Sequence, residues 1–465
     1  MNTLRRRNVF KCGIPFAFLL FINLSFGQSI SLAPNVGPPT TETFVSGSGF
    51  TRYARIFIFF DRTKLQAVYA DSTGSFTNIP IRVPRWALPG EHPVSAAEVD
   101  NRASARARFA VRTNWAQFRF DARQSGYNPY ENILSLDSVR GLQLRWKVGG
   151  GNILSSPVVA NGVVYAGLVT GGLQALNANT GAQVWAFLPY GHIASSPAVK
   201  RDMVYLGAGA DYYDYVYALS ASSGAMLWTF YTGGDIYSTT VANAVVYVGS
   251  YDNGALYALN ATTGAMFWSY GANSWQSSPA EANGVLYIGS YYDGSLYALD
   301  ATTGALLWKY TAGEYINSSP AVANGVVYVG SGSSGILHAV DASTGILLWK
   351  YTTGGSEILS SPAVANGAVY IGDPQGNVLA LNARTGTLLW KYPTGGTYVS
   401  SSPALANGVL YVGTENGDIL ALNAKNGAFL WEYTTGASIS SSPVVANGIL
   451  YVGSSDGNLY AFGVR

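Results

Sequence analysis

SSPAVANGVVYVG, at residues 318–330, and ALDATTGALLW, at residues 298–308, are the two stretches that decide the fold. Both recur along the chain after residue 142, with a spacing of 40 to 42 residues. A repeat of this length is typical of a propeller or a solenoid, in which one supersecondary unit recurs. The first stretch aligns eight times on one anchor position, which holds proline in seven copies and threonine in one: Pro157, Pro197, Thr239, Pro279, Pro320, Pro362, Pro403 and Pro443.

Each repeat reads as four short β-strands joined by tight turns. The first strand follows a serine pair and ends in six copies at Asn-Gly, such as Asn324-Gly325, which favours a type I′ hairpin because both residues tolerate positive φ. VVYVG is the second strand, and turns such as Asp293-Gly294 lead to the third, LYAL. A D/N-A-x-T-G turn then leads to a fourth strand with a tryptophan. Four short strands in each unit predict the blade of a β-propeller.

The tryptophans predict how the ring closes. The last repeat, residues 442–462, has three strands and no tryptophan, whereas Trp146, in LQLRWKV, precedes the first repeat. The economical solution is that the strand around Trp146 completes the last blade, which also removes open sheet edges. We therefore expect an all-β chain with an eight-bladed propeller over residues 142–465. The tryptophans assigned to fourth strands are Trp146, Trp185, Trp228, Trp268, Trp308, Trp349, Trp390 and Trp431.

Residues 1–27 have the composition of a secretory signal peptide. A start with four Lys/Arg precedes an apolar run at residues 13–26, which is too short for a transmembrane anchor, and small residues precede a cleavage site before Gln28. Cys12 is the only cysteine, so the mature chain would have neither disulfides nor thiolate metal sites. After cleavage 23 of the 27 basic residues remain against 25 acidic ones. We expect an exported protein without a membrane span, in the periplasm or outside the cell.

Residues 28–112 read as a separate small β-sandwich. Near its end, residues 103–111 alternate between apolar and polar, the period of a strand with one buried and one solvated face. Arginines occupy the solvated positions; they are either an ordinary exposed face or a contact for acidic glycans or phosphates. The GSGF, DSTGSF and LPGEHPV elements resemble bacterial immunoglobulin-like modules of the IPT/TIG type. Residues 113–141 connect this domain to the propeller, and we expect Trp115, Phe118 and Phe120 to pack the connector against a domain.

The tryptophan element resembles a known family. The pattern A-L-(D/N)-A-x-(T/S/N)-G-x-x-x-W, which recurs in seven copies between residues 175–185 and 421–431 with one departure each in two of them (Ser220 and Val340), is similar to the tryptophan-docking motif of quinoprotein (PQQ-type) propellers. WAQFRFD, at residues 115–121, and GYNPYE, at residues 126–131, resemble the segment that enters such propellers. The resemblance covers residues 115–465. It is specific for the fold and not for chemistry.

This resemblance implies two classes of function. Some members are dehydrogenases that bind PQQ and calcium on the ring axis, and others use the ring only for binding, as in the propeller subunit of the outer-membrane protein assembly machinery. The dehydrogenases typically have a vicinal cysteine pair and long loops with calcium ligands and a catalytic aspartate. The mature chain has no cysteine, and its repeats leave no room for such loops. We therefore expect no cofactor and a non-catalytic binding protein, with a PQQ-dependent dehydrogenase as the alternative.

The loops on one face of the ring carry the candidate site. Loops between blades share a face with the loops between second and third strands, and that face commonly binds partners in propellers. In blades two to four these loops are rich in tyrosine and aspartate, which suits a protein, peptide or glycan. The alternative is that tyrosine fills half-buried β positions and that Asp-Gly makes turns. The candidate partner-binding residues are Tyr212, Tyr213, Asp214, Asp235, Tyr237, Tyr251, Asp252, Trp275, Tyr291, Tyr292, Asp293, Glu314 and Tyr315.

Other kinds of site find no support in the sequence. The three histidines, His92, His192 and His338, are scattered over two domains, and a lone residue such as His192 is more often a hydrogen-bonded surface side chain than a metal ligand. The serine pair has no base beside it in each copy, so we assign it to hydrogen bonding within the first strand. No glycine-rich phosphate loop opens a helix, and no clustered positive charge indicates nucleic acid. We expect a monomer, with a carbohydrate-binding surface protein as a further alternative.

Overall fold

The computed structural model describes residues 27–100, 103–169, 172–193, 195–210, 213–237, 239–271, 275–396 and 398–464. Apart from Gly27, the expected signal peptide lies outside these ranges. The described residues divide into two compact units, one built mainly from residues 42–82 and 92–109 and the other mainly from residues 110–465. The predicted all-β class is confirmed, since the one helix among the described residues is a 3₁₀ turn, η1 (Val139–Gly141).

The strands of the first unit belong to two sheets, of three and five strands. Ile56, Ile58 and Phe60 are fully buried, and the residues between them are partly exposed, so one face of β4 covers the core. In β8, Phe109 is buried while Arg108 is exposed, which is the predicted alternation. The sheets run β1-β3-β6 and β2-β8-β7-β4-β5, with β1 (Ser29–Ala33), β2 (Val36–Gly37), β3 (Glu42–Ser48), β4 (Arg55–Phe60), β5 (Thr63–Tyr69), β6 (Phe76–Arg82), β7 (Gly90–Glu98) and β8 (Ser104–Val111).

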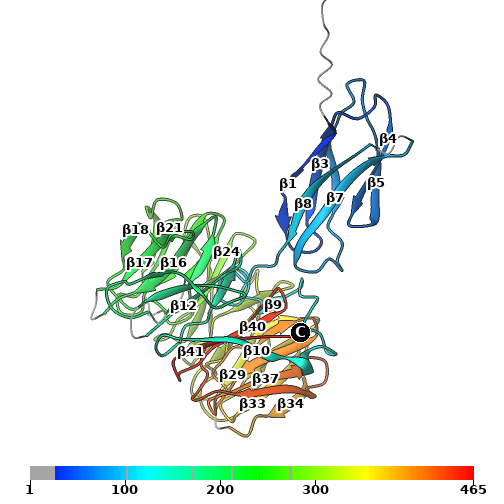
Figure 1. Ribbon diagram of the computed structural model, residues 1–465. Coiled ribbons are helices and arrows are strands. Elements are labelled where there is room, and N and C mark those ends of the chain that lie inside the picture. The colour runs from blue at the N-terminus through cyan, green and yellow to red at the C-terminus, as the bar shows by residue number, and fades with distance from the viewer. Residues whose placement is uncertain are drawn as a thin grey trace, which may run out of the picture. The chain divides into compact units, whose positions relative to one another are not determined.

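The second unit is the propeller, and its described residues form eight blades of antiparallel strands (Figure 1). The predicted number of blades is confirmed. Blades 1 to 4 contain β11 (Val158–Ala160), β12 (Val163–Gly167), β13 (Leu173–Asn177) and β14 (Gln183–Phe187); β15 (Ala198–Lys200), β16 (Met203–Ala208), β17 (Tyr215–Ser220) and β18 (Met226–Tyr231); β19 (Thr239–Ala242), β20 (Val245–Gly249), β21 (Ala255–Asn260) and β22 (Met266–Gly271); and β23 (Ala280–Ala282), β24 (Val285–Gly289), β25 (Ser295–Asp300) and β26 (Leu306–Thr311).

Blades 5 to 8 repeat this pattern, and two of them include strands from the region before the first repeat. Blade 7 adds β9 (Tyr127–Asn128), and blade 8 adds β10 (Gln143–Gly149). Their other strands are β27 (Ala321–Ala323), β28 (Val326–Ser331), β29 (Ile336–Asp341) and β30 (Leu347–Thr352); β31 (Ala363–Ala365), β32 (Ala368–Gly372), β33 (Asn377–Asn382) and β34 (Leu388–Pro393); β35 (Ala404–Ala406), β36 (Val409–Gly413), β37 (Asp418–Asn423) and β38 (Phe429–Thr434); and β39 (Val444–Ala446), β40 (Ile449–Gly453) and β41 (Asn458–Gly463).

Strand β10 closes the ring by pairing with the C-terminal strand. β10 lies antiparallel to β41, with Trp146 opposite Ala461, and Figure 1 shows the two strands side by side. The Trp146 indole N–H and the Tyr451 hydroxyl both donate to the carbonyl oxygen of Ala178 in blade 1, at 3.1 and 3.0 Å. Blade 8 therefore contacts blade 1 through a residue from each end of the propeller sequence.

The same contact links successive blades and explains why aromatic residues and a turn glycine recur in the repeat. In blade 1, the Tyr165 hydroxyl and the Trp185 indole N–H both donate to the carbonyl oxygen of Ala221 in the turn of blade 2, at 3.3 and 2.9 Å. The glycine of that turn, Gly224, has φ +71°, and a Cβ there would lie 2.6 Å from the Trp185 ring. The T-G turn therefore needs glycine both for its left-handed backbone and for the close approach of the indole.

The serine pair has a structural role within and between blades. Ser155 illustrates the first serine: its hydroxyl donates to the Gly167 carbonyl at 3.0 Å and accepts from the Gly167 N–H at 2.9 Å. The second serine makes a belt around the axis, because its backbone N–H donates to the hydroxyl of the equivalent serine in the next blade. Six of these links are described, from Ser156, Ser278, Ser319, Ser361, Ser402 and Ser442, the last of which donates back to Ser156.

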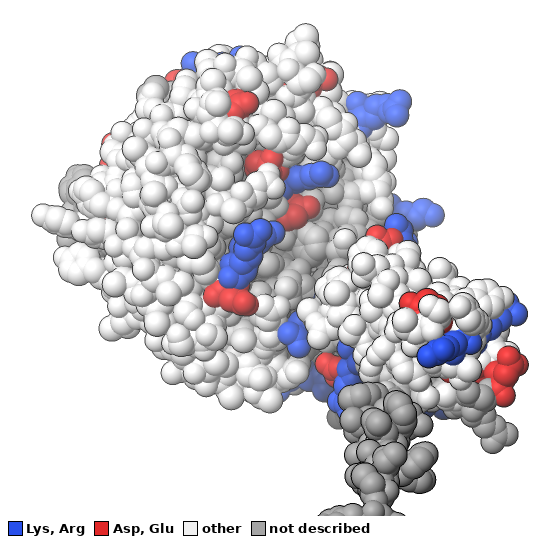
Figure 2. All heavy atoms as spheres, turned by 90° about the horizontal axis from the view of Figure 1, so that it is seen from above, with Lys and Arg blue, Asp and Glu red and all other residues white. Residues whose placement is uncertain are grey.

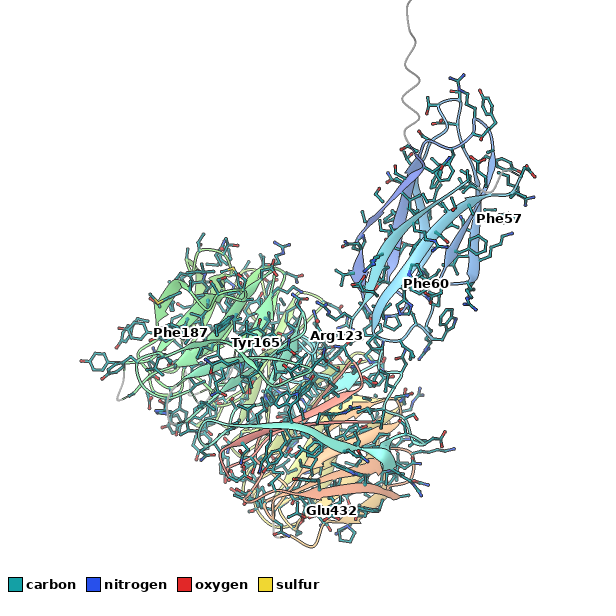
Figure 3. The ribbon with its side chains drawn as sticks, viewed as in Figure 1. Phe57, Phe60, Arg123, Tyr165, Phe187 and Glu432 are labelled. Atoms are coloured by element: carbon teal, nitrogen blue, oxygen red, sulfur yellow. The ribbon has the colours of Figure 1, made fainter. Side chains whose placement is uncertain are left out.

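The connector runs around the axis and bonds to the first strand of every blade. Each bond reaches the residue two positions after the anchor, which lies inside the first strand of its blade. The Arg119 guanidinium is buried there and donates to the carbonyls of Gln124, Ser361 and Pro362. The partners, in chain order, are Trp115 with Val159, Ala116 with Val199, Gln117 with Val241, Ala122 with Glu281, Arg123 (labelled in Figure 3) with Val322, Ser125 with Val364, Gly126 with Leu405, and Asn128 with Val445.

Candidate functional site

The predicted loop face exists and lies opposite the connector. Loops between blades enter the first strand at its serine end, and they hydrogen-bond to the loops between second and third strands. The backbone of His192 pairs with that of Gly209, and the Tyr251 N–H donates to the Asp235 carbonyl at 2.9 Å. The Gly332 N–H likewise donates to the Tyr315 carbonyl at 2.7 Å. The two sets of loops therefore form one continuous surface across blades 2 to 5.

Five predicted tyrosines meet on this face, and we call them the tyrosine cluster: Tyr237, Tyr251, Tyr291, Tyr292 and Tyr315. Successive ring centroids lie 6.0 Å apart for Tyr237–Tyr251, 5.9 Å for Tyr251–Tyr292, 5.5 Å for Tyr291–Tyr292 and 5.0 Å for Tyr291–Tyr315. Tyr292 is 71% exposed and Tyr237 is 37% exposed. The cluster is thus a row of mutually supported aromatic rings that still presents polar and apolar surface to solvent.

Three aspartates lie at one end of the tyrosine cluster. Asp214 is buried, and burial together with the charges of Asp235 and Asp252 raises its pKa to about 6. Burial and the charge of Asp252 also raise the pKa of Asp235. A cavity of about 90 Å³ lies between the loops and is lined by Asp214, Asp235, Tyr237 and His192. This corner of the face therefore concentrates negative charge next to aromatic side chains.

Four other candidates are placed differently from the tyrosine cluster. Trp275 is fully buried, packs against Tyr297 at 5.3 Å and donates its indole N–H to the Gly254 carbonyl, so its assignment to a contact surface is wrong. The Asp293 carboxylate forms an ion pair with Lys309 at 2.8 Å. The Glu314 carboxylate accepts hydrogen bonds from the Ser334 N–H and hydroxyl. Tyr213 is 58% exposed, and Tyr212 lies outside the described residues.

The alignment of the repeats contains a signal that explains the burial of Trp275. Trp275 stands four positions before its anchor, where other blades have Ile316, Ile358 or Val399, all buried. Each of these side chains packs on the glycine that ends a second strand; Trp275 lies against Gly249 as Ile316 lies against Gly289. The position four residues before the anchor is therefore a core position of the repeat. Conversely, His192 stands one position earlier, at the surface, where it lines the cavity that the sequence did not predict.

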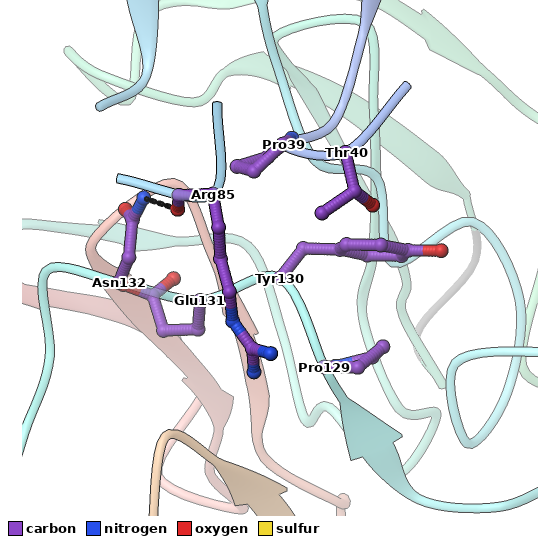
Figure 4. A pocket seen from close by; sticks show the side chains of 7 residues that line it. All are labelled: Pro39, Thr40, Arg85, Pro129, Tyr130, Glu131 and Asn132. Carbon is purple, nitrogen blue, oxygen red and sulfur yellow. Dashed lines mark hydrogen bonds between the residues drawn. The ribbon is translucent and has the colours of Figure 1, made fainter. Parts of the chain in front are cut away.

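A larger cavity within the second unit is lined in part by the side chains of Glu131 and Asn132, which hydrogen-bond to loop backbone. It has a volume of about 230 Å³ and is lined by Pro39, Thr40, Arg85, Pro129, Tyr130, Glu131 and Asn132 (Figure 4). The Glu131 carboxylate accepts the N–H groups of Ile133, Leu134 and Gly448, and the Asn132 amide donates to the Arg85 carbonyl at 3.3 Å. Because these hydrogen bonds hold the ends of loops in place, we assign no binding or catalytic role to this cavity.

Charge on the surface is sparse. In the view of Figure 2, Lys/Arg and Asp/Glu occur as single residues or small mixed groups on a mainly uncharged surface. Among the residues that the structure describes, no group of three or more His, Cys, Asp or Glu side chains is arranged to hold a metal ion. Within the same residues, no helix has the length and apolar character needed to cross a membrane.

Blades with docked tryptophans and a ring closed by an N-terminal strand define a β-propeller of the quinoprotein type. The family model for outer membrane protein assembly factor BamB matches residues 130–209, 169–279, 272–402 and 396–465, and the chain belongs to this family. No curated protein sequence matches the chain.

Solved structures of two functional classes share the fold. BamB from Moraxella catarrhalis superposes with a TM-score of 0.59 at 20% identity, covering 69% of this chain and 99% of BamB. The quinohemoprotein alcohol dehydrogenase from Comamonas testosteroni has a TM-score of 0.64 at 16% identity, covering 76% of this chain and 80% of the enzyme. A europium-containing methanol dehydrogenase also has a TM-score of 0.64, at 13% identity, with coverage of 76% and 98%. At these identities the likeness establishes the fold and does not choose between binding and catalysis.

Proposed function

We propose that this protein is an exported, non-catalytic binding platform of the cell envelope that holds a protein partner on the loop face of blades 2 to 5. The observation that carries the proposal is the tyrosine cluster, in which the exposed rings of Tyr237 and Tyr292 contact partly buried tyrosines of neighbouring blades on the face opposite the connector. Tyrosine is enriched in protein interfaces because it buries a large rigid surface and retains a hydrogen-bonding group. The family match to an outer membrane assembly factor supports a place in the envelope and a protein as partner.

Two observations favour binding over a PQQ-dependent reaction. A calcium ion with its quinone needs several oxygen ligands in one place, and the described residues offer no such group of carboxylates. In the connector, the buried side chains of Arg119 and Gln124 donate hydrogen bonds to the backbone carbonyls of Ser361 and Pro279 in the blades. These observations support a binding role rather than PQQ chemistry for the described residues. Titration of the purified protein with PQQ and Ca²⁺, followed by quinone absorbance and dye reduction, tests this alternative directly.

Photocrosslinking from single positions tests the binding proposal in living cells. A photoreactive amino acid at position 292 should capture one protein from the envelope in high yield, because Tyr292 projects from the face. The same amino acid at position 389 is the matched control, since Leu389 is 51% exposed but lies on the outer strand of blade 6. Equal products from both positions, or none from 292, would contradict the proposal. Binding to a glycan array, with no protein captured, would favour the carbohydrate-binding alternative instead.

A further inference from the structure

The cavity beside the tyrosine cluster is built from three successive loops. His192 comes from the loop between β14 and β15, and Asp214 from the loop between β16 and β17. Asp235 and Tyr237 come from the loop between β18 and β19. The floor is apolar, made by Ala208 and Ile236 with two glycines of blade 2. We call this the aspartate cavity.

One carboxylate oxygen in the aspartate cavity has no partner in the part of the chain that the structure describes. Asp214 is 3% exposed, and its Oδ2 atom is buried without a hydrogen bond among the described residues. Its backbone is held firmly, because the Asp214 carbonyl accepts both the N–H and the hydroxyl of Thr232, at 2.9 and 3.0 Å. Leaving a buried carboxylate unpaired is unfavourable, since the group loses hydration and gains nothing in exchange. The cavity is therefore preformed around an unmet negative charge.

The negative charges of neighbouring aspartates further favour a cation beside Asp214. Asp235 and Asp252 both act on Asp214, and the Asp252 carboxylate accepts the Asp235 N–H at 3.1 Å. The ion pairs with Lys or Arg among the described residues do not include any of these aspartates, whereas Asp293 on the same face is paired with Lys309. Among the described residues that line the cavity, His192 is the one basic side chain. The balance of fixed charge in this corner of the face is thus negative.

We propose that the aspartate cavity binds the terminal cation of a lysine or arginine side chain contributed by the protein partner. This inference rests on the proposed function and specifies the chemistry of the partner at one point of the loop face. A volume of about 90 Å³ accommodates a group a few times larger than a water molecule, which occupies about 30 Å³. Tyr237 and Tyr251 stand beside the cavity, where their rings would cover the aliphatic stem and attract the cation. A metal ion is less suited, because the described side chains are not arranged as a metal-binding group.

Proton uptake by the cavity gives the inference a pH signature. A bound cation favours ionised Asp214, so the affinity should be full above the pKa of about 6 and should decline as the pH falls through it. The groups that face Asp214 are Asp235, Asp252 and His192, and Asp235, whose pKa is also raised, loses negative charge on acidification in the same direction. Weaker binding below pH 6 than at pH 7.5 is therefore expected.

Isothermal titration of the full chain with short peptides tests the inference. The probes are acetyl-Gly-Gly-Xaa-Gly-Gly-amide peptides in which Xaa is lysine, arginine, norleucine or citrulline. The lysine or arginine peptide should bind at least about 30-fold more tightly than its uncharged counterpart, and Asp214→Asn should remove about that factor, because breaking a buried charge pair is strongly unfavourable. Asp456→Asn, in the equivalent loop of blade 8, is the matched control and should leave binding unchanged.

Several results would overturn this inference. Equal binding of the norleucine and lysine peptides would show that charge is not recognised, and competition by millimolar Ca²⁺ with a defined stoichiometry would show a metal site instead. If Asp214→Asn does not fold, Asp235→Asn supplies the same comparison from a partly exposed position. The outcome is separable from that of the proposed function: crosslinks from position 292 that persist in Asp214→Asn, with no charge preference among the peptides, would retain the binding platform and remove only the lysine or arginine cavity.

Discussion

Replacement of Trp146 by alanine should destabilise the propeller as strongly as the loss of a central core residue, although Trp146 comes from outside the repeats. Its side chain is 9% exposed, its N–H donates to the Ala178 carbonyl, and its ring lies where a Cβ on Gly181 would be 2.8 Å away. Truncation of a buried tryptophan to alanine costs about 3–5 kcal/mol. Trp146→Phe should cost only about 1 kcal/mol, because the ring remains and Ala178 still accepts the Tyr451 hydroxyl.

Urea denaturation of the full chain, followed by far-UV circular dichroism, measures these differences. Leu389→Ala is the control, because Leu389 is 51% exposed on an outer strand and its truncation should change the free energy of unfolding by less than about 0.5 kcal/mol. From most to least stable, the order of the variants should be Leu389→Ala, Trp146→Phe and Trp146→Ala. If Trp146→Ala unfolds at the same urea concentration as the control, then β10 does not close the ring in solution.

Three further predictions concern single positions in the propeller. Gly304→Ala should cost about 2 kcal/mol, because φ is +74° and a Cβ would lie 2.7 Å from the Trp268 ring, whereas Gly271→Ala, with nothing within 4 Å, should be nearly neutral in the same urea assay. Burial lowers the pKa of His338 to about 4, below its unfolded value near 6.5, so His338 should destabilise the fold progressively as the pH falls from about 6.5 to 4; His338→Gln should flatten this part of the stability–pH profile, and an unchanged profile would contradict the assignment. Arg119→Lys should cost about 2 kcal/mol in thermal or urea unfolding, because one ammonium cannot satisfy the three carbonyls that the buried guanidinium reaches, and a wild-type midpoint would count against the anchoring role of the connector.

The repeat made the blades predictable because each recurring residue has one physical task. The tyrosine of the second strand and the tryptophan of the fourth bind the next blade, as Tyr165 and Trp185 do, and the turn glycine admits the indole. The number of fourth-strand tryptophans in the sequence therefore predicted the number of blades. The surplus residue, Trp146, pointed to the closing strand for the same reason.

The connector and the cavity could not be predicted from the same evidence. Residues 115–128 have no internal repeat, so nothing in their sequence indicates that they bond to all eight first strands in order. From its place between two blades, Trp275 was predicted to be an exposed loop residue. Its core position becomes visible only when the residues that stand four positions before each anchor are compared with one another. The aspartate cavity arises where loops of different lengths meet in space. Asp214 and His192 come from different loops of the propeller, and no recurring spacing in the sequence links the two residues.

The affinity of the protein partner captured at position 292 for the Tyr237→Ala/Tyr292→Ala double variant tests the loop-face account most directly. Exposed aromatic residues at the centre of an interface typically contribute 2 kcal/mol or more, so the double variant should bind at least about 30-fold more weakly while its urea midpoint stays within error of the unmodified protein. An undiminished affinity, measured by isothermal titration with the same purified partner, would contradict the claim that blades 2 to 5 present the binding surface.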